Sequence, residues 1–336
     1  MSQLVDAIRP FWLPGINEVS GVIEKGLAGW ICDREFQIYE NPQSDRFSLE
    51  VGEPSRLIEA FAADVNRPAL ASIETINQIS RSDLLPKSAA WLVIKSYYAS
   101  YFAAHAIMRM LGTSFAHITK QEINSINKVA ELYGKESALA NAGYFLCRCE
   151  AGGNKLTCER EIATGANHEM FWIAFVKRLR NLSDELLKSK IGSAGNNQFA
   201  STRLTELCDS LCRAPSVKGS WLSHMRNEVN YKQRLQVWYP YQESKNYYNR
   251  LFQGCELWEA DTGSIALEPD ADHPLRTFQL SCSFIINLCK ELIVDMASRC
   301  PSGKSFHLFG SVGLMNLLKQ RRAQHRRSAV GIGVRP

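Results

Sequence analysis

Residues 91–112, WLVIKSYYASYFAAHAIMRMLG, decide the fold of this chain. Apolar side chains occupy nearly every core position of a helix, and no Gly or Pro interrupts the run before Gly112. Gly at that place is typical of a helix C-terminus, because it adopts the left-handed backbone without penalty. The pattern therefore predicts a helix over 87–111. His105 shares one face with Tyr98 and Tyr101 and is interpreted as a core residue.

A second informative stretch, WLSHMRNEVNY, follows about 130 residues later at 221–231. At roughly 100° per residue, Leu222, Met225 and Val229 form an apolar stripe along this predicted helix. His224, Asn227 and Tyr231 then share the opposite face, and Arg226 lies at the side of the stripe. We expect these polar residues to carry whatever chemistry the helix supports.

The paired aromatic and small residues of the first helix, followed by the Arg226 helix, resemble the HEPN superfamily. The resemblance covers about 87–233 and implies an antiparallel four-helix bundle. Many HEPN proteins are metal-independent endoribonucleases of prokaryotic defence and toxin systems, in which an Arg and a His meet in a dimer cleft. The Arg stabilises charge in the transition state and the His transfers a proton.

This chain departs from the family motif at the histidine. Tyr231 stands five positions after Arg226, and no His lies four to seven positions after it. A phenol with a pKa near 10 is a poor base at neutral pH, and the Arg-to-Tyr form is typical of members that bind nucleotides or partners without cutting. One interpretation is that His224 of a second protomer replaces the missing histidine and serves Arg226 of the first. The alternative is that His224 is a surface residue and Arg226 pairs with an acid such as Glu228.

The candidate site therefore consists of Arg226, Asn227, Tyr231 and His224. Two hypotheses follow: a dimeric RNA-directed effector, such as a metal-independent endoribonuclease, or a non-catalytic component that binds a partner protein or a nucleotide. No cofactor or metal is expected. Cys147, Cys149, Cys158 and His168 could ligate zinc, but they lack the usual closely spaced cysteine pairs, so a hairpin with incidental cysteines is the preferred interpretation.

The fold class expected is mostly α, a HEPN-like bundle with a β-hairpin insertion and extra terminal elements. We expect an N-terminal α+β segment at 1–84, the bundle at 85–235 with the hairpin at about 141–162, a helical extension at 236–318 and a basic tail at 319–336. A further hairpin is expected around 41–45. Helical patterns also cover 54–65, 72–80, 119–133, 167–187, 198–212, 220–233, 274–298 and 305–326.

The net charge of +5 resides in the tail. Six cations and no acid follow Leu318, and removing them from the 39 Lys and Arg leaves 33, against 34 Asp and Glu. Such an arm can contact RNA phosphates, or it can be a solvated terminus. The candidate RNA-binding residues are Lys319, Arg321, Arg322, Arg326 and Arg327.

An aromatic stretch at 231–252 is interleaved with Lys and Arg, so it can stack on single-stranded bases or fill a core or a protein interface. The first residues lack the basic start and apolar core of a secretory signal. The apolar run at 282–298 is broken by Lys290, Glu291 and Asp295, so no membrane span is expected. The expectation is a cytoplasmic protein that forms a homodimer or a complex with another defence-system protein.

Overall fold

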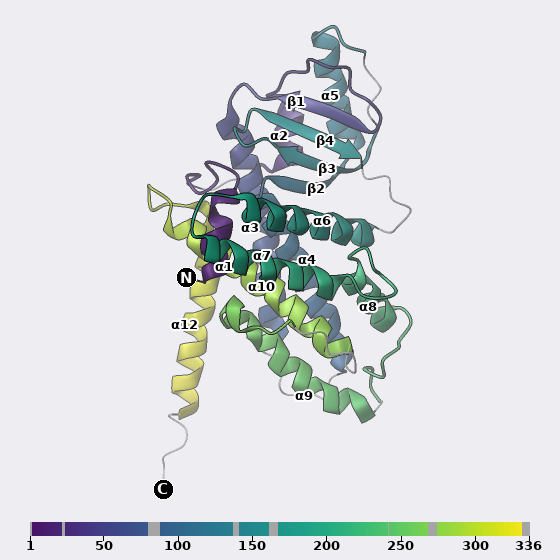
Figure 1. The fold of residues 1–336 in the computed structure, drawn as a ribbon, viewed down its shortest axis with the longest axis vertical. Coiled ribbons are helices and arrows are strands. Elements are labelled where there is room, and N and C mark those ends of the chain that lie inside the picture. Colours follow the sequence, from purple (N-terminus) through teal and green to yellow (C-terminus); the bar gives the residue numbers. More distant parts are fainter. Residues whose placement is uncertain are drawn as a thin grey trace.

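The computed structural model describes residues 2–21, 24–79, 88–136, 141–160, 167–240, 242–267 and 274–330, with the side chains of 242–247 and 321–330 outside the description. The protein is mostly helical, at 63%, with one small antiparallel sheet, as expected for the fold class (Figure 1). The helices are α1 (Gln3–Ile8), α2 (Leu27–Asp33), α3 (Pro54–Ile79), α4 (Ala89–Met110), α5 (Lys120–Leu132), α6 (Asn167–Lys188), α7 (Ala194–Leu211), α8 (Trp221–Asn230), α9 (Gln242–Glu256), α10 (Pro274–Ser298), α11 (Phe306–Phe309) and α12 (Ser311–Val330).

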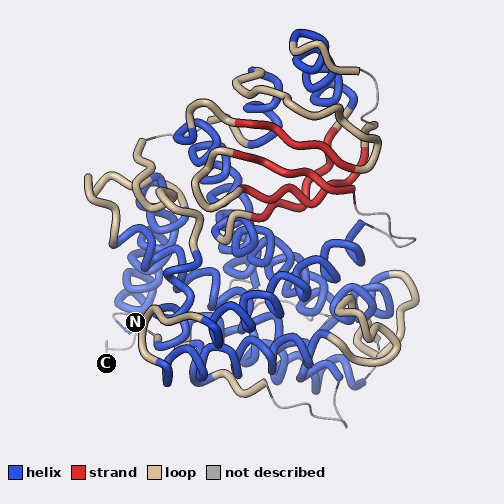
Figure 2. The backbone as a smooth tube through the Cα atoms, turned by 45° about the horizontal axis from the view of Figure 1, so that its top comes forward, coloured by secondary structure: helices blue, strands red, loops and turns tan. Residues whose placement is uncertain are grey.

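Helix α4, the helix predicted over 87–111, lies at the centre of the molecule. It packs against α3, α8, α9 and α10. The helices form the larger part of the molecule, and the strands lie together at one end of it (Figure 2). Its small residues, among them Ala99 and Ala103, are completely buried and permit close helix packing. Gly112 follows the helix with φ +70° and connects it directly to the sheet. The predicted C-terminal glycine is therefore confirmed.

The sheet has four strands, in the order β1-β4-β3-β2, at the end of the molecule opposite α9 (Figure 1). The strands are β1 (Arg46–Glu50), β2 (Thr113–Ile118), β3 (Gly143–Cys149) and β4 (Lys155–Arg160). β3 and β4 form the predicted hairpin, with Cys147 opposite Cys158. β1 pairs with β4 and β2 with β3, so the hairpin is the middle of a larger sheet.

One local prediction is wrong and one is confirmed in part. Residues 54–79 form one helix instead of two, with Pro68 inside it, because buried residues along its length pack against α4. That packing outweighs the backbone hydrogen bond that Pro removes. The segments of the hairpin expected around 41–45 do pair antiparallel, through two hydrogen bonds between Gln37 and Glu50 of β1. Residues 36–39 form only this bridge and no strand, while Phe36 and Ile38 enter the core.

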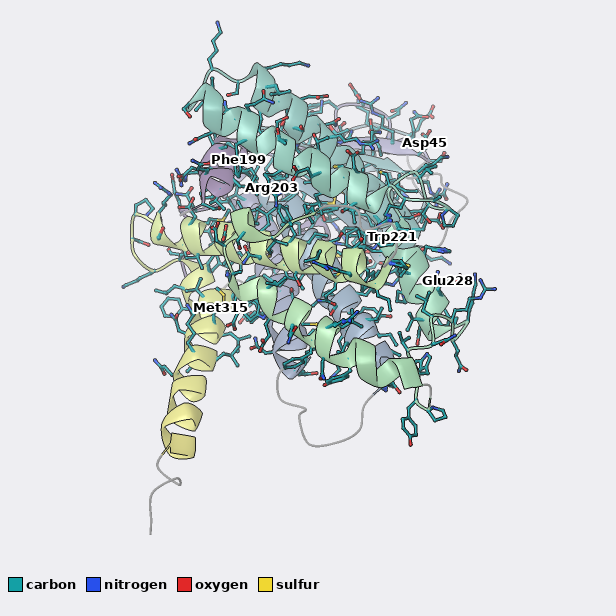
Figure 3. The ribbon with its side chains drawn as sticks, turned by 60° about the horizontal axis from the view of Figure 1, so that its bottom comes forward. Asp45, Phe199, Arg203, Trp221, Glu228 and Met315 are labelled. Carbon is teal, nitrogen blue, oxygen red and sulfur yellow. The ribbon has the colours of Figure 1, made fainter. Side chains whose placement is uncertain are left out.

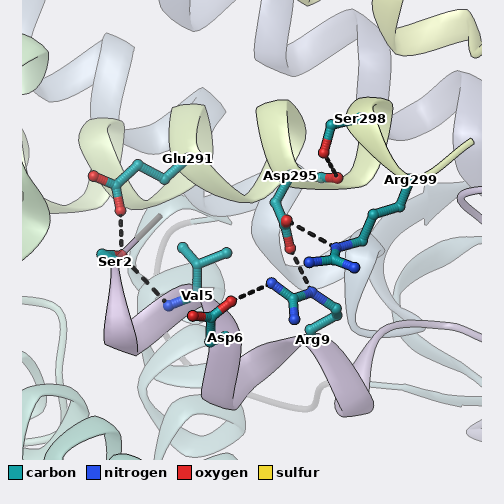
Figure 4. Close-up of polar contacts among 8 residues, drawn as sticks. All are labelled: Ser2, Val5, Asp6, Arg9, Glu291, Asp295, Ser298 and Arg299. Atoms are coloured by element: carbon teal, nitrogen blue, oxygen red, sulfur yellow. Dashed lines mark hydrogen bonds and ion pairs between the residues drawn. The ribbon is translucent and has the colours of Figure 1, made fainter.

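The short helix α1 is attached to α10 by polar contacts that the sequence pattern did not predict (Figure 4). Arg9 Nε lies 2.7 Å from Asp295 Oδ2, and Arg299 Nε lies 3.0 Å from Asp295 Oδ1. Ser2 Oγ donates to Glu291 at 2.6 Å. Among the described residues, no helix has both the length and the hydropathy needed to cross a membrane.

Candidate functional site

The side chain of Arg226 lies inside the helical part of the molecule, with only 5% of the residue exposed. Helix α8 places it there because the predicted stripe of Leu222, Met225 and Val229 is buried against the neighbouring helices. Gly219 and Ser220 precede the helix. Trp221 at its first position, labelled in Figure 3, packs edge-on against Phe278 of α10.

Three tyrosine rings surround the Arg226 guanidinium. Its Cζ lies 5.1 Å from the ring centre of Tyr97, 5.9 Å from that of Tyr98 and 5.3 Å from that of Tyr231. Each such contact stabilises the cation by about 0.5–2 kcal/mol. Within the described residues no carboxylate forms an ion pair with Arg226, and its Nε has no hydrogen-bond partner. The site therefore holds a buried positive charge without a counter-ion.

A histidine joins this cluster from α6. The Nδ1 atom of His168 lies 2.9 Å from the hydroxyl of Tyr97, which also accepts a hydrogen bond from Trp172 Nε1 at 3.1 Å. Burial raises the pKa of Tyr97, and its hydrogen bonds with Trp172, Ser223 and Arg226 offset part of that rise. The phenol of α4 thus links the histidine of α6 to the arginine of α8.

His168 is half-buried, and burial followed by the charge of Arg226 lowers its pKa from 6.5 to about 4. The imidazole is therefore neutral at pH 7, so it can accept a proton at one nitrogen and donate a hydrogen bond from the other. From the sequence, His168 was a candidate only for zinc ligation. It lies 58 positions before Arg226, and its spacing within α6 gives no sign that the two residues meet.

The structure brings together only two of the four residues predicted for the site, as far as the described contacts show. Arg226 and Tyr231 are in contact, and Tyr231 is 70% exposed. His224 faces Glu228, with Nε2 3.9 Å from Oε1, and no described contact joins it to Arg226. Asn227 is half-buried, and its Oδ1 has no partner within the described residues.

Glu228, the acid considered as a partner of Arg226, pairs with other cations. Its carboxylate accepts from Lys232 at 2.6 Å and from Arg234 at 2.9 Å. These hydrogen bonds lower the pKa of Glu228, Lys232 contributing most. The acid therefore fastens the chain that follows α8, and its described ion pairs do not include Arg226.

The other predicted residues lie elsewhere. Lys319 is exposed on α12, and the side chains of Arg321, Arg322, Arg326 and Arg327 are outside the described residues. His105 is stacked on Phe171, with ring centres 3.8 Å apart, and Arg109 Nη1 lies 2.8 Å from its Nδ1. Burial, more than the charge of Arg109, lowers the pKa of His105 far below its ordinary value. His105 is half-buried and packs on Tyr101 and Phe171, which agrees with the structural role expected for it.

The cysteines and His168 do not converge. Cys147 and Cys158 face each other across β3 and β4 with their Sγ atoms 3.2 Å apart, whereas His168 bonds to Tyr97. Across the described ranges, no three His, Cys, Asp or Glu side chains gather as a metal site would require.

The cluster of Arg226, His168, Tyr97, Tyr98 and Tyr231 combines a cation that has no counter-ion among the described residues, a neutral imidazole and aromatic faces. Such a set is chemically suited to an anion joined to a flat group, as in a nucleotide phosphate. Comparison with known protein families, with curated proteins and with solved structures gave no match for this chain.

Proposed function

We propose that this protein is an RNA-directed effector built on a HEPN-like helical bundle, in which Arg226 and His168 bind an RNA phosphate and act on it without a metal ion. The observation that carries the proposal is the buried guanidinium of Arg226, which has no carboxylate partner among the described residues and lies beside the imidazole-bearing cluster. A buried charge without a partner is costly. A phosphate oxygen would supply the missing negative charge.

In the proposed cleavage, Arg226 and His168 have separate roles. Arg226 stabilises the charge that develops on the phosphate. Neutral His168 removes the proton from the RNA 2′-hydroxyl, a role that the family motif gives to a residue after the Arg. The 2′-oxygen attacks the adjacent phosphorus to form a 2′,3′-cyclic phosphate, while the bond to the 5′-oxygen breaks and that oxygen takes a proton from water. The role of His168 needs the ring proton on Nδ1, donated to the Tyr97 oxygen, so that Nε2 is free to act as the base.

A second candidate function is non-catalytic binding of a nucleotide or of a partner protein. Two observations favour it: Arg226 is only 5% exposed, and Tyr231 stands where cleaving members of the superfamily carry His. If Tyr97 donates to Nδ1 instead, the His168 proton is on Nε2, and the ring can only donate to a bound phosphate. The proposed setting for either function is a cytoplasmic defence or toxin system, as a homodimer or with a partner.

The experiment incubates the full-length protein with labelled RNA in EDTA and measures both cleavage and binding. We expect Arg226→Ala and Arg226→Lys to reduce cleavage by about 10²- to 10³-fold, the usual cost of losing one transition-state donor. His168→Gln should reduce it by about 10²-fold or more. An unchanged circular dichroism spectrum and unfolding midpoint would show that Arg226→Lys still folds.

Matched controls test whether these losses are specific. Arg213 also contacts an α8 aromatic ring, with Cζ 5.0 Å from the centre of Trp221, and His117 packs on Tyr144 on the sheet. Arg213→Ala and His117→Gln should therefore keep the activity. Binding without cleavage, lost in Arg226→Ala, would support the non-catalytic function. If the wild type neither binds nor cleaves RNA, the RNA-directed function is wrong.

A further inference from the structure

Four aromatic residues lie in the segment that follows α8 or at the start of α4. We call Trp91, Tyr231, Trp238 and Tyr239 the aromatic platform. Tyr231 is 70%, Tyr239 72% and Trp91 53% exposed, and Trp238 is half-buried. Large aromatic rings so open to water are unfavourable in a protein without a partner for them.

Hydrogen bonds and ring packing fix the platform to two helices. Trp238 Nε1 donates to the carbonyl of Val229 in α8 at 2.8 Å, and its ring lies edge-on to Trp91 of α4 with centres 5.4 Å apart. The backbone N–H of Tyr239 donates to Ser88 Oγ at 2.7 Å. The start of α4 and the 237–239 segment are therefore held together, and Tyr231, at the beginning of the same 231–240 segment, contacts the Arg226 guanidinium.

The backbone beneath the platform adopts an unfavourable conformation. Gln233, Leu235 and Gln236 have φ values of +51°, +67° and +52°, in the left-handed region that residues with a Cβ rarely occupy. Each such residue costs on the order of 1 kcal/mol, and clusters of them are common at binding sites. Lys232 and Arg234 oppose this cost through their bonds to Glu228 and hold the segment in one shape.

Charge at the platform matches a nucleic acid. The side chains of Lys232 and Arg234 are 51% and 65% exposed, and Arg226 is a third cation. Among the described residues, the carboxylate that pairs with Lys232 and Arg234 is that of Glu228. Exposed aromatic faces next to cations bind bases by stacking and the backbone by attraction. The bases of a duplex already stack on one another, so their faces are not open to such rings.

We propose that the aromatic platform binds a single-stranded nucleic acid, whose bases stack on Trp91, Tyr231 and Tyr239 while one phosphate lies at Arg226. The proposal rests on the proposed function and adds to it the strandedness of the ligand and the path of the strand. The strand leaves the Arg226 site over Tyr231 and continues along the 237–239 segment and the first turn of α4.

Fluorescence anisotropy of the full-length protein tests the proposal with a labelled 12-nucleotide 2′-O-methyl RNA, which lacks the free 2′-hydroxyl that cleavage needs. A duplex of the same sequence and a single-stranded DNA are the comparison probes. We expect the single strand to bind at least tenfold tighter than the duplex. Trp91→Ala and Tyr239→Ala should each weaken single-strand binding roughly 5- to 100-fold, and Tyr239→Phe, which keeps the ring, should restore it.

Tyr39→Ala is the matched control, because Tyr39 is 58% exposed beside Tyr133 and has no contact with the platform among the described residues. One outcome is that Trp91→Ala and Tyr239→Ala bind RNA as the wild type does while Arg226→Lys binds more weakly. It would overturn the proposal that the platform binds the strand and leave the proposed function standing. Unchanged affinity in all three would overturn both. The wild type can also prove to be a dimer that Trp91→Ala and Tyr239→Ala convert to monomers without changing RNA binding. That result would identify the surface as an interface between copies and overturn the proposal.

Discussion

His307 is completely buried in α11, and neither of its ring nitrogens has a hydrogen-bond partner within the described residues. Burial lowers its pKa from 6.5 to about 3. Between these two values the unfolded chain binds a proton that the folded protein does not bind. The stability that the unprotonated His307 contributes to the folded protein is thus present in full above pH 6.5. This stability is lost as the pH falls from 6.5 toward 3.

His307→Leu should therefore make folding less sensitive to acid. In the wild type, this one group lowers the free energy of unfolding by about 1.4 kcal/mol per pH unit below pH 6. The variant loses that dependence, so its stability relative to the wild type should increase as the pH is lowered. Urea unfolding at pH 5 and pH 7.5 measures the difference, with exposed His117→Leu as the control. Equal slopes in the wild type and in His307→Leu would contradict the assignment.

At the scale of elements, the site depends on how α8 is placed against α6, because α8 carries Arg226 and α6 carries His168. Gly219, just before α8, has φ +113°, and a Cβ there would lie 2.7 Å from Cγ2 of Val176 in α6. Only Gly combines that backbone conformation with so close an approach.

Gly219→Ala should destabilise the protein by about 2–4 kcal/mol, the sum of a strained backbone and an overpacked contact. Because the two helices must move apart, the contact between Arg226 and the His168 cluster should also loosen, and RNA binding should weaken in the fraction that remains folded. Gly134→Ala, at φ +65° with nothing near its Cβ, is the control for backbone strain alone. A Gly219→Ala protein no less stable than Gly134→Ala would show that the approach to Val176 does not matter.

The elements differ in how well the sequence predicts them, and the reason is the range of the interactions. Helices α4, α5 and α10 follow from local period and caps; Thr119 and Glu122 form the capping box expected for α5. Strand β2 and the pairing of β1 with β4 depend on partners far away in the chain, so local pattern could not show them. Arg226 was predictable from its motif, whereas His168 comes close to it only through the packing of α6 on α4 and α8.

At the scale of the whole molecule, Asp295 of α10 connects that helix to the N-terminal segment, 286 positions away in the sequence. Its side chain is completely buried between Arg299 and Arg9, the residue that follows α1 (Figure 4). Removing the carboxylate would place two guanidinium groups side by side, with Asp6 left as an ion-pair partner of Arg9. Since the side chains of Arg9 and Arg299 are 25% and 42% exposed, water would compensate for part of the loss.

We therefore expect Asp295→Asn to lower the free energy of unfolding by about 2–3 kcal/mol, less than for a pair that is wholly buried. The measurement is urea unfolding, with Asp33→Asn as the control. Asp33 pairs with Lys25 at the surface, where the two side chains are 33% and 68% exposed, so its loss should cost under about 1 kcal/mol. An equal effect of the two substitutions would show that the α1–α10 connection adds no more than a surface pair.

Helix α12 and the Arg226 site lie on opposite sides of the molecule, as the positions of Met315 and Glu228 show (Figures 1 and 3). The start of α12 is fastened by Asn66, whose Oδ1 accepts from the backbone N–H of Ser311 at 3.0 Å. Its last part extends away from the other helices and carries five of the six terminal cations (Figure 1). Under the proposed function, a long RNA would bind at both places by spanning the molecule.

Deleting residues 319–336 should weaken RNA binding and flatten its dependence on salt, by roughly 0.7 in the logarithmic slope for each single-strand phosphate that the arm neutralises in the full-length protein. Because the anchor at Ser311 remains, the deletion should leave the unfolding midpoint unchanged. The effects of the deletion and of Arg226→Lys on the binding free energy should add, since distant sites without shared partners act independently. A full-length protein in which the six cations of the arm are replaced by Gln shows whether the charge of the arm, and not its length, causes the change in binding. An unchanged salt slope in both proteins would mean that the basic arm touches no phosphate.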